Sequence, residues 1–184
     1  MRVGALILAA GASKRLGKPK QLLMLGDETL LERAVRVAHA AGCSPVIVVL
    51  GASAEVIEAG CAFDDAIVVV NEDWAEGMGS SVRVGVGAVR DLDACVLMTC
   101  DMPAVTGRHL RALMSSGEVT ASFYSGKNGV PAYFPVDTFQ SLMELRGDSG
   151  AKHLLQSARS VELVGGEFDV DTMEDLVRAR ALFG

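Results

Sequence analysis

The segment of residues 6–23, LILAAGASKRLGKPKQLL, limits the possible folds of this chain more than any other segment. It begins as an apolar run typical of a buried strand, breaks at Gly11, and then places four cations within seven residues, Lys14, Arg15, Lys18 and Lys20. In an open α/β sheet the ligand binds at the carboxyl ends of the strands, and a glycine there lets the backbone approach it closely. Exposed N–H groups and cations suit a polyphosphate. We therefore expect an α/β protein that binds a nucleoside triphosphate.

The same segment lacks two familiar phosphate-binding motifs. A P-loop pattern counted from Gly11 fails because Gly17 lies six positions on and Lys18 precedes Pro19. A dinucleotide pattern, G-x-G-x-x-G, fails because no glycine stands two positions after Gly11. We therefore expect neither a P-loop kinase nor a typical Rossmann oxidoreductase. The alternative reading is a solvated basic loop, but strand, glycine break and charge occur here in the order that a ligand site requires.

Strand and helix patterns alternate along the chain. Apolar β-type runs predict strands at residues 3–9, 45–50, 66–70, 94–99, 119–124, 131–134 and 161–164. Helical periodicity predicts helices at residues 30–41, 54–61, 80–90, 109–115, 136–145, 151–157 and 172–182, and Thr172 followed by Asp175 predicts a cap on the last one. This alternation predicts one domain over residues 1–184, a Rossmann-like three-layer sandwich with a mostly parallel central sheet. The pieces near residues 119–134 leave room for an antiparallel strand.

Composition narrows the class of protein. The 184 residues are 50% hydrophobic and 22% charged, which suits a substantial core and argues against disorder. The net charge of −6 disfavours a nucleic-acid surface and an anionic membrane, so we expect small-molecule substrates. The N-terminal apolar run is too short for a membrane span and lacks a signal-peptide cleavage pattern. Four cysteines without zinc-type spacing fit a cytoplasmic, reduced protein, with a ligand-facing thiol at Cys100 as the alternative to packing.

Two acidic segments are candidates for metal binding. Asp101 directly follows the apolar run of residues 94–100, at the carboxyl end of a predicted buried strand. A carboxylate at this edge can hold Mg²⁺, which takes one or two carboxylates and completes its shell with water and phosphates; capping of a turn is the alternative role. In residues 168–172, FDVDT, strand-like alternation puts Asp169 and Asp171 on the same side. We favour Asp171 as the second ligand, with helix capping as the alternative for the pair.

Arg15 and Lys20 are the candidate catalytic cations. A reaction on a nucleoside triphosphate builds negative charge on its phosphate oxygens, which fixed cations stabilise. Arg15 offers a planar fork that fits phosphate oxygens, and Lys20 offers a compact charge. Asn71 ends the third predicted strand, and the turn after it opens a helix near Ser80 whose N–H groups suit a phosphate or a base edge. Trp74 in that turn is either a stacking or a packing residue.

The block LAAGxSxRLGxPKQLL resembles the signature of the small nucleotidyltransferases that attach a nucleotide to molybdopterin, in particular their cytidylyltransferase branch. The resemblance continues in order through NEDWAEGMGSS at residues 71–81, CDMP at 100–103, GDSGA at 147–151 and DVDTMED at 169–175. It implies a fold of glycosyltransferase-A-like type and Mg²⁺-dependent transfer of CMP from CTP to the terminal phosphate of molybdenum-molybdopterin. It also implies a molybdoenzyme or a cofactor-insertion chaperone as a partner.

The resemblance and the residue patterns together assign roles. The expected catalytic residues are Arg15, Lys20 and Asp101, and the expected metal ligands are Asp101 and Asp171. Nucleotide-binding residues are expected to be Leu8, Ala9, Ala10, Gly11, Ser13, Arg15, Lys20, Asn71, Gly79 and Ser80. Acceptor-binding residues are expected to be Gly129, Pro131, Asp148 and Lys152. The chain departs from the family pattern at Met173, where proline is usual, and at Lys152, where arginine is usual.

The choice of nucleotide and acceptor depends on few residues. Ala9-Ala10-Gly11 matches the cytidylyl branch, whereas the guanylyl branch usually carries Leu-Ala-Gly-Gly, and the methyl group of Ala10 narrows the space beside the base. We therefore expect CTP. Three alternatives stay open: a guanylyltransferase for the same cofactor, a sugar- or polyol-phosphate nucleotidyltransferase, and a non-catalytic nucleotide-binding cofactor chaperone in which Asp101 is dispensable.

Overall fold

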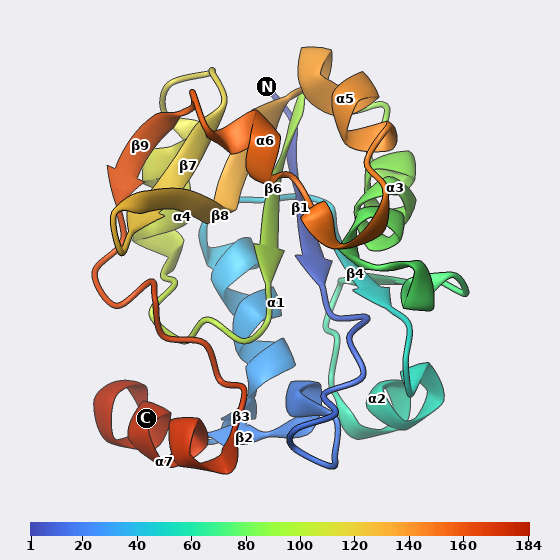
Figure 1. Ribbon diagram of the computed structural model, residues 1–184, viewed down its shortest axis with the longest axis vertical. Helices are drawn as coiled ribbons and strands as arrows, with labels where there is room; N and C mark the ends of the chain where they lie inside the picture. The colour runs from blue at the N-terminus through green and yellow to red at the C-terminus, as the bar shows by residue number, and fades with distance from the viewer.

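A seven-stranded sheet forms the middle layer of the protein (Figure 1). The computed structural model describes residues 1–184, apart from the side chain of Ser149. The strands stand in the order β5-β4-β1-β6-β8-β7-β9. Their bounds are β1 Val3–Leu8, β4 Val46–Leu50, β5 Ile67–Val70, β6 Ala94–Thr99, β7 Thr120–Tyr124, β8 Lys127–Pro135 and β9 Arg159–Glu162, and a separate hairpin consists of β2 Met24–Leu25 and β3 Glu28–Thr29.

The sheet is parallel on one side and mixed on the other. Strands β5, β4, β1 and β6 pair in parallel, whereas β8 runs antiparallel to both β6 and β7, and β7 pairs in parallel with β9. The predictions of a mostly parallel sheet and of an antiparallel strand within residues 119–134 are therefore confirmed. Leu8 at the end of β1 pairs with Val49 of β4 and with Thr99 of β6. The loops after these strands consequently leave the sheet at the same edge.

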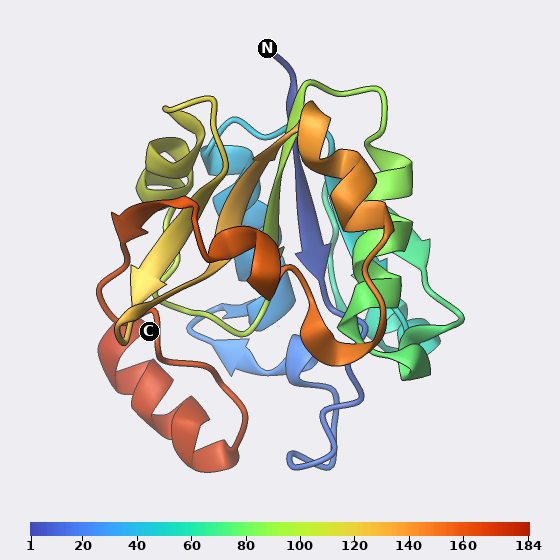
Figure 2. The same cartoon turned by 45° about the horizontal axis from the view of Figure 1, so that its top comes forward.

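Helices cover both faces of the sheet (Figure 1, Figure 2). Ala5 and Ile7 of β1 pack with the helices of one face, while Leu6 and Leu8 pack with those of the other. Burial on both faces explains why β1 is continuously apolar. On the first face lie α1 (Leu30–Ala40) and α4 (Gly107–Met114), and on the second lie α3 (Met78–Ala88), α5 (Phe139–Met143) and α6 (Lys152–Leu155). The remaining helical elements are α2 (Ala54–Gly60), α7 (Met173–Phe183) and the 3₁₀ turns η1 (Lys20–Leu22), η2 (Trp74–Glu76), η3 (Val136–Thr138) and η4 (Gly147–Ser149).

Helix α7 packs on the β2–β3 hairpin rather than on the main sheet (Figure 1). Leu176 of α7 and Val170, which precedes the helix, are buried in a small third core with Leu23 and Leu25. The Thr172 side chain accepts a hydrogen bond from the backbone N–H of Asp175, whose carboxylate accepts one from the backbone N–H of Thr172. The predicted cap is thereby confirmed, and the segment before α7 is held from both sides.

Several elements differ from the expectations: β8 begins four residues before the expected strand at 131–134, and α6 is shorter than the helix expected at 151–157. The β2–β3 hairpin was not predicted, because strands of two residues show no hydrophobic period. The last strand is Arg159–Glu162 rather than 161–164, because pairing with β7 sets its ends, and Val164 is 84% exposed. The helix expected over residues 136–145 is a 3₁₀ turn followed by the short α5; Thr138 Oγ1 donates to the Pro135 carbonyl instead of capping a longer helix.

Among the described residues, no helix has the length and apolar character needed to span a membrane.

Candidate active site

The carboxyl ends of β1 and β6 open onto a cavity of about 400 Å³, which we call the first cavity. The loop after β1 forms one wall, the end of β6 forms a second, and the turn before α3 forms a third. Six of the expected nucleotide-binding residues line this cavity: Leu8, Ala9, Ala10, Gly11, Ser13 and Lys20. The other lining residues are Ala12, Lys14, Gln21, Trp74, Ala75, Gly77, Met78, Ser81, Thr99, Cys100, Asp101 and Asp148. The opening loop and the strand end at Asp101 therefore face a common space.

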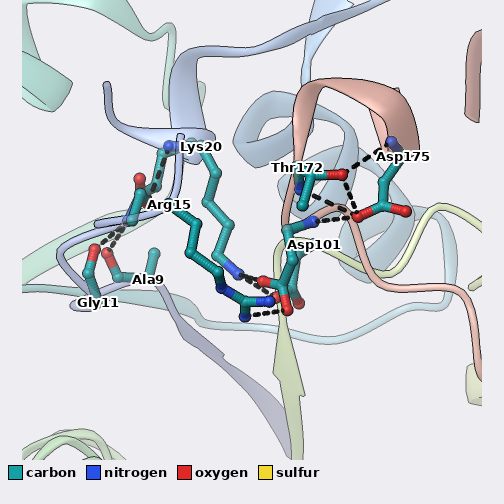
Figure 3. A network of polar contacts seen from close by, with 10 residues as sticks. Ala9, Gly11, Arg15, Lys20, Asp101, Thr172 and Asp175 are labelled. Carbon is teal, nitrogen blue, oxygen red and sulfur yellow. Dashed lines mark hydrogen bonds and ion pairs between the residues drawn. The ribbon is translucent and has the colours of Figure 1, made fainter. Parts of the chain in front are cut away.

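Four charged side chains form one network beside the first cavity (Figure 3). Lys20 Nζ lies 2.5 Å from Asp101 Oδ2 and 3.0 Å from Asp171 Oδ1, and Arg15 Nη2 lies 2.6 Å from Asp171 Oδ2. Burial lowers the pKa of Lys20, but the adjacent charges and hydrogen bonds of the two carboxylates outweigh it, so the pKa is raised. For Asp171, burial raises the pKa, but Lys20 and Arg15 outweigh it and the pKa is lowered. The structure thus brings together all four residues expected to act in catalysis or metal binding.

A backbone hydrogen bond places the carboxylates next to one another. The N–H group of Val170 donates to the carbonyl of Asp101 at 2.9 Å, and the Val170 side chain is completely buried. The residues on either side of Val170, Asp169 and Asp171, are therefore held beside Asp101. Partial burial raises the pKa of the Asp169 carboxyl to about 7, and the neighbouring charges of Asp101 and Asp171 add to the increase. Asp171 shares the Lys20 ammonium with Asp101, which favours it over Asp169 as the partner carboxylate.

The loop that carries the cations is fixed by two polar side chains. Ser13 Oγ accepts a hydrogen bond from the backbone N–H of Lys20 at 3.0 Å. Gln21, which is only 1% exposed, donates from Nε2 to the carbonyls of Ala9 at 2.6 Å and Gly11 at 3.3 Å. These bonds tie η1 back onto the strand end. The Lys20 side chain therefore extends toward the carboxylates from an anchored backbone.

Arg15 lies outside the first cavity. It lines a neighbouring hollow of about 210 Å³ together with Leu16, Lys20 and Asp171. Its side chain is 70% exposed, and its described ion pair is with Asp171. Arg15 is therefore placed at the rim of the charged network, where its guanidinium meets solvent.

Besides Arg15, three expected nucleotide-binding residues do not reach the first cavity. Asn71 is 2% exposed, and its Nδ2 donates to Ser80 Oγ at 2.8 Å and to Ser81 Oγ at 2.9 Å. Its Oδ1 accepts from the backbone N–H of Asp73. Gly79 is buried against the backbone of residues 146 and 147. The geometry of Asn71, Gly79 and Ser80 supports a different role from the expected contact, because they join the end of β5 to the start of α3 and so position Trp74 and Ser81.

A second cavity of about 880 Å³ lies beside the β7–β8 hairpin. Three of the four expected acceptor-binding residues line it, Gly129, Asp148 and Lys152. The fourth, Pro131, is buried and lies outside the lining, because it is part of β8 and its carbonyl accepts a hydrogen bond from Ser122 Oγ at 2.6 Å. Asp148 and Met78 line both the first and the second cavity, so the two spaces adjoin.

The carboxylates fit a hard divalent cation by their chemistry. Mg²⁺ prefers oxygen ligands and commonly uses one or two carboxylates with water and substrate phosphates. Asp101 and Asp171 provide such a pair, since both already contact one compact cation, the Lys20 ammonium. Within the described part of the chain, no group of three His, Cys, Asp or Glu side chains is arranged to hold a metal ion. A pair of carboxylates leaves the other ligand positions of such a cation to water and substrate phosphates.

Several residues of the site were missed or left open by sequence reasoning. Gln21 and Tyr124 were not singled out. Gln21 is a polar residue directly before the apolar run of residues 22–25, which was an available signal, whereas nothing local marks Tyr124, which lines the second cavity. Trp74 lines the first cavity, which favours ligand contact over simple packing. Burial, with the charge of Asp101, raises the pKa of the Cys100 thiol to about 12, so this thiol stays protonated and packs in the core.

Comparison with known proteins agrees with this geometry. Residues 5–162 match the model of the MobA-like NTP transferase domain. The chain is 33% identical to nicotine blue oxidoreductase of Paenarthrobacter nicotinovorans, over 96% of this chain and 95% of that protein. It is 28% identical to the molybdenum cofactor cytidylyltransferase of Escherichia coli, over 97% of this chain and 95% of that protein. The chain belongs to the MobA-like NTP transferase family, a family of nucleotidyltransferases.

Solved structures extend the comparison to the fold. Rv0371c from Mycobacterium tuberculosis superposes with a TM-score of 0.88 at 34% identity and covers 98% of each chain. The same protein in complex with manganese gives a TM-score of 0.82 at 31% identity, over 99% of this chain and all of that chain. CTP:phosphocholine cytidylyltransferase (LicC) from Streptococcus pneumoniae gives 0.72 at 16% identity over the whole of both chains, which shows the shared fold. The expected nucleotidyltransferase type of α/β fold is therefore confirmed.

Proposed function

We propose that this protein transfers CMP from CTP to the terminal phosphate of molybdenum-molybdopterin and releases pyrophosphate, with Mg²⁺ as its cofactor. The observation that carries the proposal is the network of Arg15, Lys20, Asp101 and Asp171, which lies beside the loop of residues 9–14 at the carboxyl ends of β1 and β6. Cations and carboxylates in this arrangement serve a reaction in which negative charge develops on phosphate oxygens.

The reaction needs no covalent intermediate with the protein. A phosphate oxygen of the acceptor forms a bond to the α-phosphorus of CTP while the bond from that phosphorus to the bridging oxygen breaks, and the electron pair leaves with pyrophosphate. Lys20 and Arg15 would stabilise the charge on the α-phosphate and the leaving group. Asp101 and Asp171 would hold Mg²⁺, which supplies Lewis-acid stabilisation of phosphoryl oxygens when bound. The anchored backbone of the loop supplies orientation.

The preference for CTP depends on the wall of the first cavity. Ala10 lines this cavity, and its side chain is only 7% exposed. A Cβ atom added at Gly51 would lie 2.8 Å from Ala10 Cβ and 2.6 Å from Trp74 Cβ, so these side chains share one crowded space. The methyl group of Ala10 would leave less room for a purine than a glycine at this position would. The resemblance of Ala9-Ala10-Gly11 to the cytidylyl branch supports the same choice.

The acceptor would lie in the second cavity. Its lining combines Tyr124, Val130 and Leu155 with two lysines, Lys127 and Lys152. Such a lining suits an acceptor with a ring system and an anionic group, as in a pterin phosphate. It suits a cationic acceptor such as phosphocholine less well, because the two ammonium groups outnumber the single carboxylate of the lining, that of Asp148.

The test is pyrophosphate release by purified protein with Mg²⁺ and molybdenum-loaded molybdopterin, with CTP, GTP, ATP and UTP offered separately. We expect release with CTP. Release with GTP alone would keep the chemistry and replace the nucleotide, and release only with a sugar or polyol phosphate would replace the acceptor. Binding of CTP without release in any combination would favour the non-catalytic chaperone. Because one relative is named an oxidoreductase, reduction of nicotine blue by NADH or NADPH is measured in parallel, and turnover there without pyrophosphate release would reject the proposal.

A further inference from the structure

Lys20 occupies the position between the two carboxylates that suit a divalent cation. Its Nζ atom contacts Asp101 Oδ2 at 2.5 Å and Asp171 Oδ1 at 3.0 Å. The side chains of Lys20 and Asp101 are 17% and 14% exposed, so this contact is largely shielded from water. The Lys20 ammonium therefore lies where the oxygen atoms of Asp101 and Asp171 would bind a divalent cation.

The ammonium and a divalent cation exclude each other from this position. Both would need the same two carboxylate oxygens, and two positive charges at such short range repel strongly where water is scarce. We propose that Lys20 is the internal occupant of the metal position, and that it leaves Asp101 and Asp171 when a divalent cation binds them. The proposal rests on the metal site of the proposed function and not on the identity of the nucleotide or the acceptor.

The structure provides a place for the displaced side chain. The Lys20 backbone is fixed by the bond from its N–H to Ser13 Oγ, so only the side chain has to move. Lys20 lines the first cavity and also the hollow next to Arg15. Once it leaves the carboxylates, its ammonium is available to the phosphates of a nucleotide in the first cavity.

This exchange couples binding of the divalent cation to binding of the nucleoside triphosphate. Metal binding releases the cation that the triphosphate needs, and a triphosphate that attracts Lys20 frees the carboxylates for the metal. By linkage, each ligand raises the affinity for the other. Arg15 extends the same exchange, because its partner Asp171 is one of the two carboxylates.

The first experiment measures Mn²⁺ binding in the absence of nucleotide, by the electron paramagnetic resonance signal of free Mn²⁺. K20M removes the competing charge and keeps most of the side-chain volume. We expect K20M to bind Mn²⁺ at least about fivefold more tightly than the wild type, the lower end of typical coupling between linked sites. The matched control is K18M, which removes an exposed cation two residues away and should leave affinity unchanged. Affinity in K20M equal to or weaker than that of the wild type would overturn the exchange.

A second readout uses the wild-type protein and so does not depend on the folding of K20M. The ¹⁵Nζ resonance of Lys20, assigned through its loss in K20R, reports the environment of the ammonium directly. Addition of Mg²⁺ without nucleotide should shift this resonance or remove it through faster exchange with water. An unchanged Lys20 resonance would overturn the proposal. Neither experiment includes CTP or acceptor, so absence of CMP transfer leaves the exchange standing, and a transferring enzyme without the exchange rejects only this inference.

Discussion

The two cavities that meet at Asp148 and Met78 are built in different ways. The first lies at the ends of the parallel strands β1 and β6, and its Lys20 pairs with Asp101 at 2.5 Å and with the adjacent Asp171 at 3.0 Å. The second lies beside the antiparallel hairpin β7–β8, and within the described residues its Lys127 and Lys152 form no ion pair. Under the proposed function, this difference suits a preorganised reaction site in the first cavity and a second cavity whose lysine side chains are still free to adjust to a ligand.

The largest expected effect concerns the first cavity, where Asp101 pairs with Lys20. D101N should lower kcat for pyrophosphate release by roughly 10²–10³-fold, because one carboxylate ligand of the Mg²⁺ that would stabilise the reacting phosphates is lost. The melting temperature should change little, since Asp171 still pairs with Lys20. The control is D137N, which neutralises an exposed carboxylate elsewhere on the surface. Near-normal turnover of D101N would remove Asp101 from the reaction and make the first cavity no more specialised than the second.

A smaller effect is expected from the wall of the first cavity. In G51A the new Cβ atom would lie 2.6 to 2.9 Å from Trp74 and 2.8 Å from Ala10, so both side chains must shift. We expect KM for CTP to rise about tenfold, the effect of a lost contact worth about 1.4 kcal/mol, while KM for the acceptor stays near the wild-type value. G87A is the matched control, because a Cβ atom there meets nothing within 4 Å. If both variants keep the wild-type KM for CTP, the base does not use this wall.

Changes to the two lysines of the second cavity should have weaker effects. Replacing both lysines in K127M/K152M should raise KM for the acceptor by about 2- to 5-fold per lysine, as expected for exposed charges. The effect should shrink at high salt, because exposed charges are screened, and KM for CTP should not change. The double variant is compared with K18M. A fall in kcat instead of a rise in acceptor KM would show that the second cavity takes part in the chemical step.

The smallest expected effect concerns stability at mildly acidic pH. His109 of α4 is buried and its Nε2 hydrogen-bonds Ser122 Oγ of β7 at 2.8 Å, and burial lowers its pKa below the ordinary 6.5. The unfolded chain therefore binds a proton near pH 6.5 that the folded chain does not, so stability is complete above that pH and falls as pH decreases. The slope is at most about 1.4 kcal/mol per pH unit for one proton. Urea unfolding at several pH values should show a flatter profile for H109Q, and a wild-type profile in that variant would exclude His109 as its source.

The parts of the site that follow directly after buried strands were predictable from sequence. Leu8 to Gly11 and Asp101 come at the ends of continuous apolar runs, and parallel pairing of β1 with β6 brings these ends together. The acidic segment that contains Asp171 was predictable, but its contact with the end of β6 was not. That contact depends on the hydrogen bond from Val170 to Asp101, and these two residues lie far apart in the chain.

Other features depend on interactions that no local pattern encodes. Asn71 has the sequence position of a ligand-binding residue, yet its amide is used by Ser80 and Ser81. Gln21 binds two carbonyls of the loop that precedes it, which becomes apparent only when η1 folds back. The ends of β9 follow from its pairing with β7 rather than from its own hydrophobic residues.

The hydrogen bond from Val170 to Asp101 also has a consequence for biosynthesis. Asp171 lies 151 residues after Lys20, so a ribosome makes the cations and Asp101 long before it makes their second carboxylate. The strands of the main sheet all precede residue 163, and the sheet can pair before the last segment emerges. Until Val170 docks and α7 closes on the β2–β3 hairpin, Lys20 has one carboxylate partner instead of two. A nascent chain in which residues 169–171 have not yet docked would therefore display the loop after β1 with Lys20 paired to Asp101 alone.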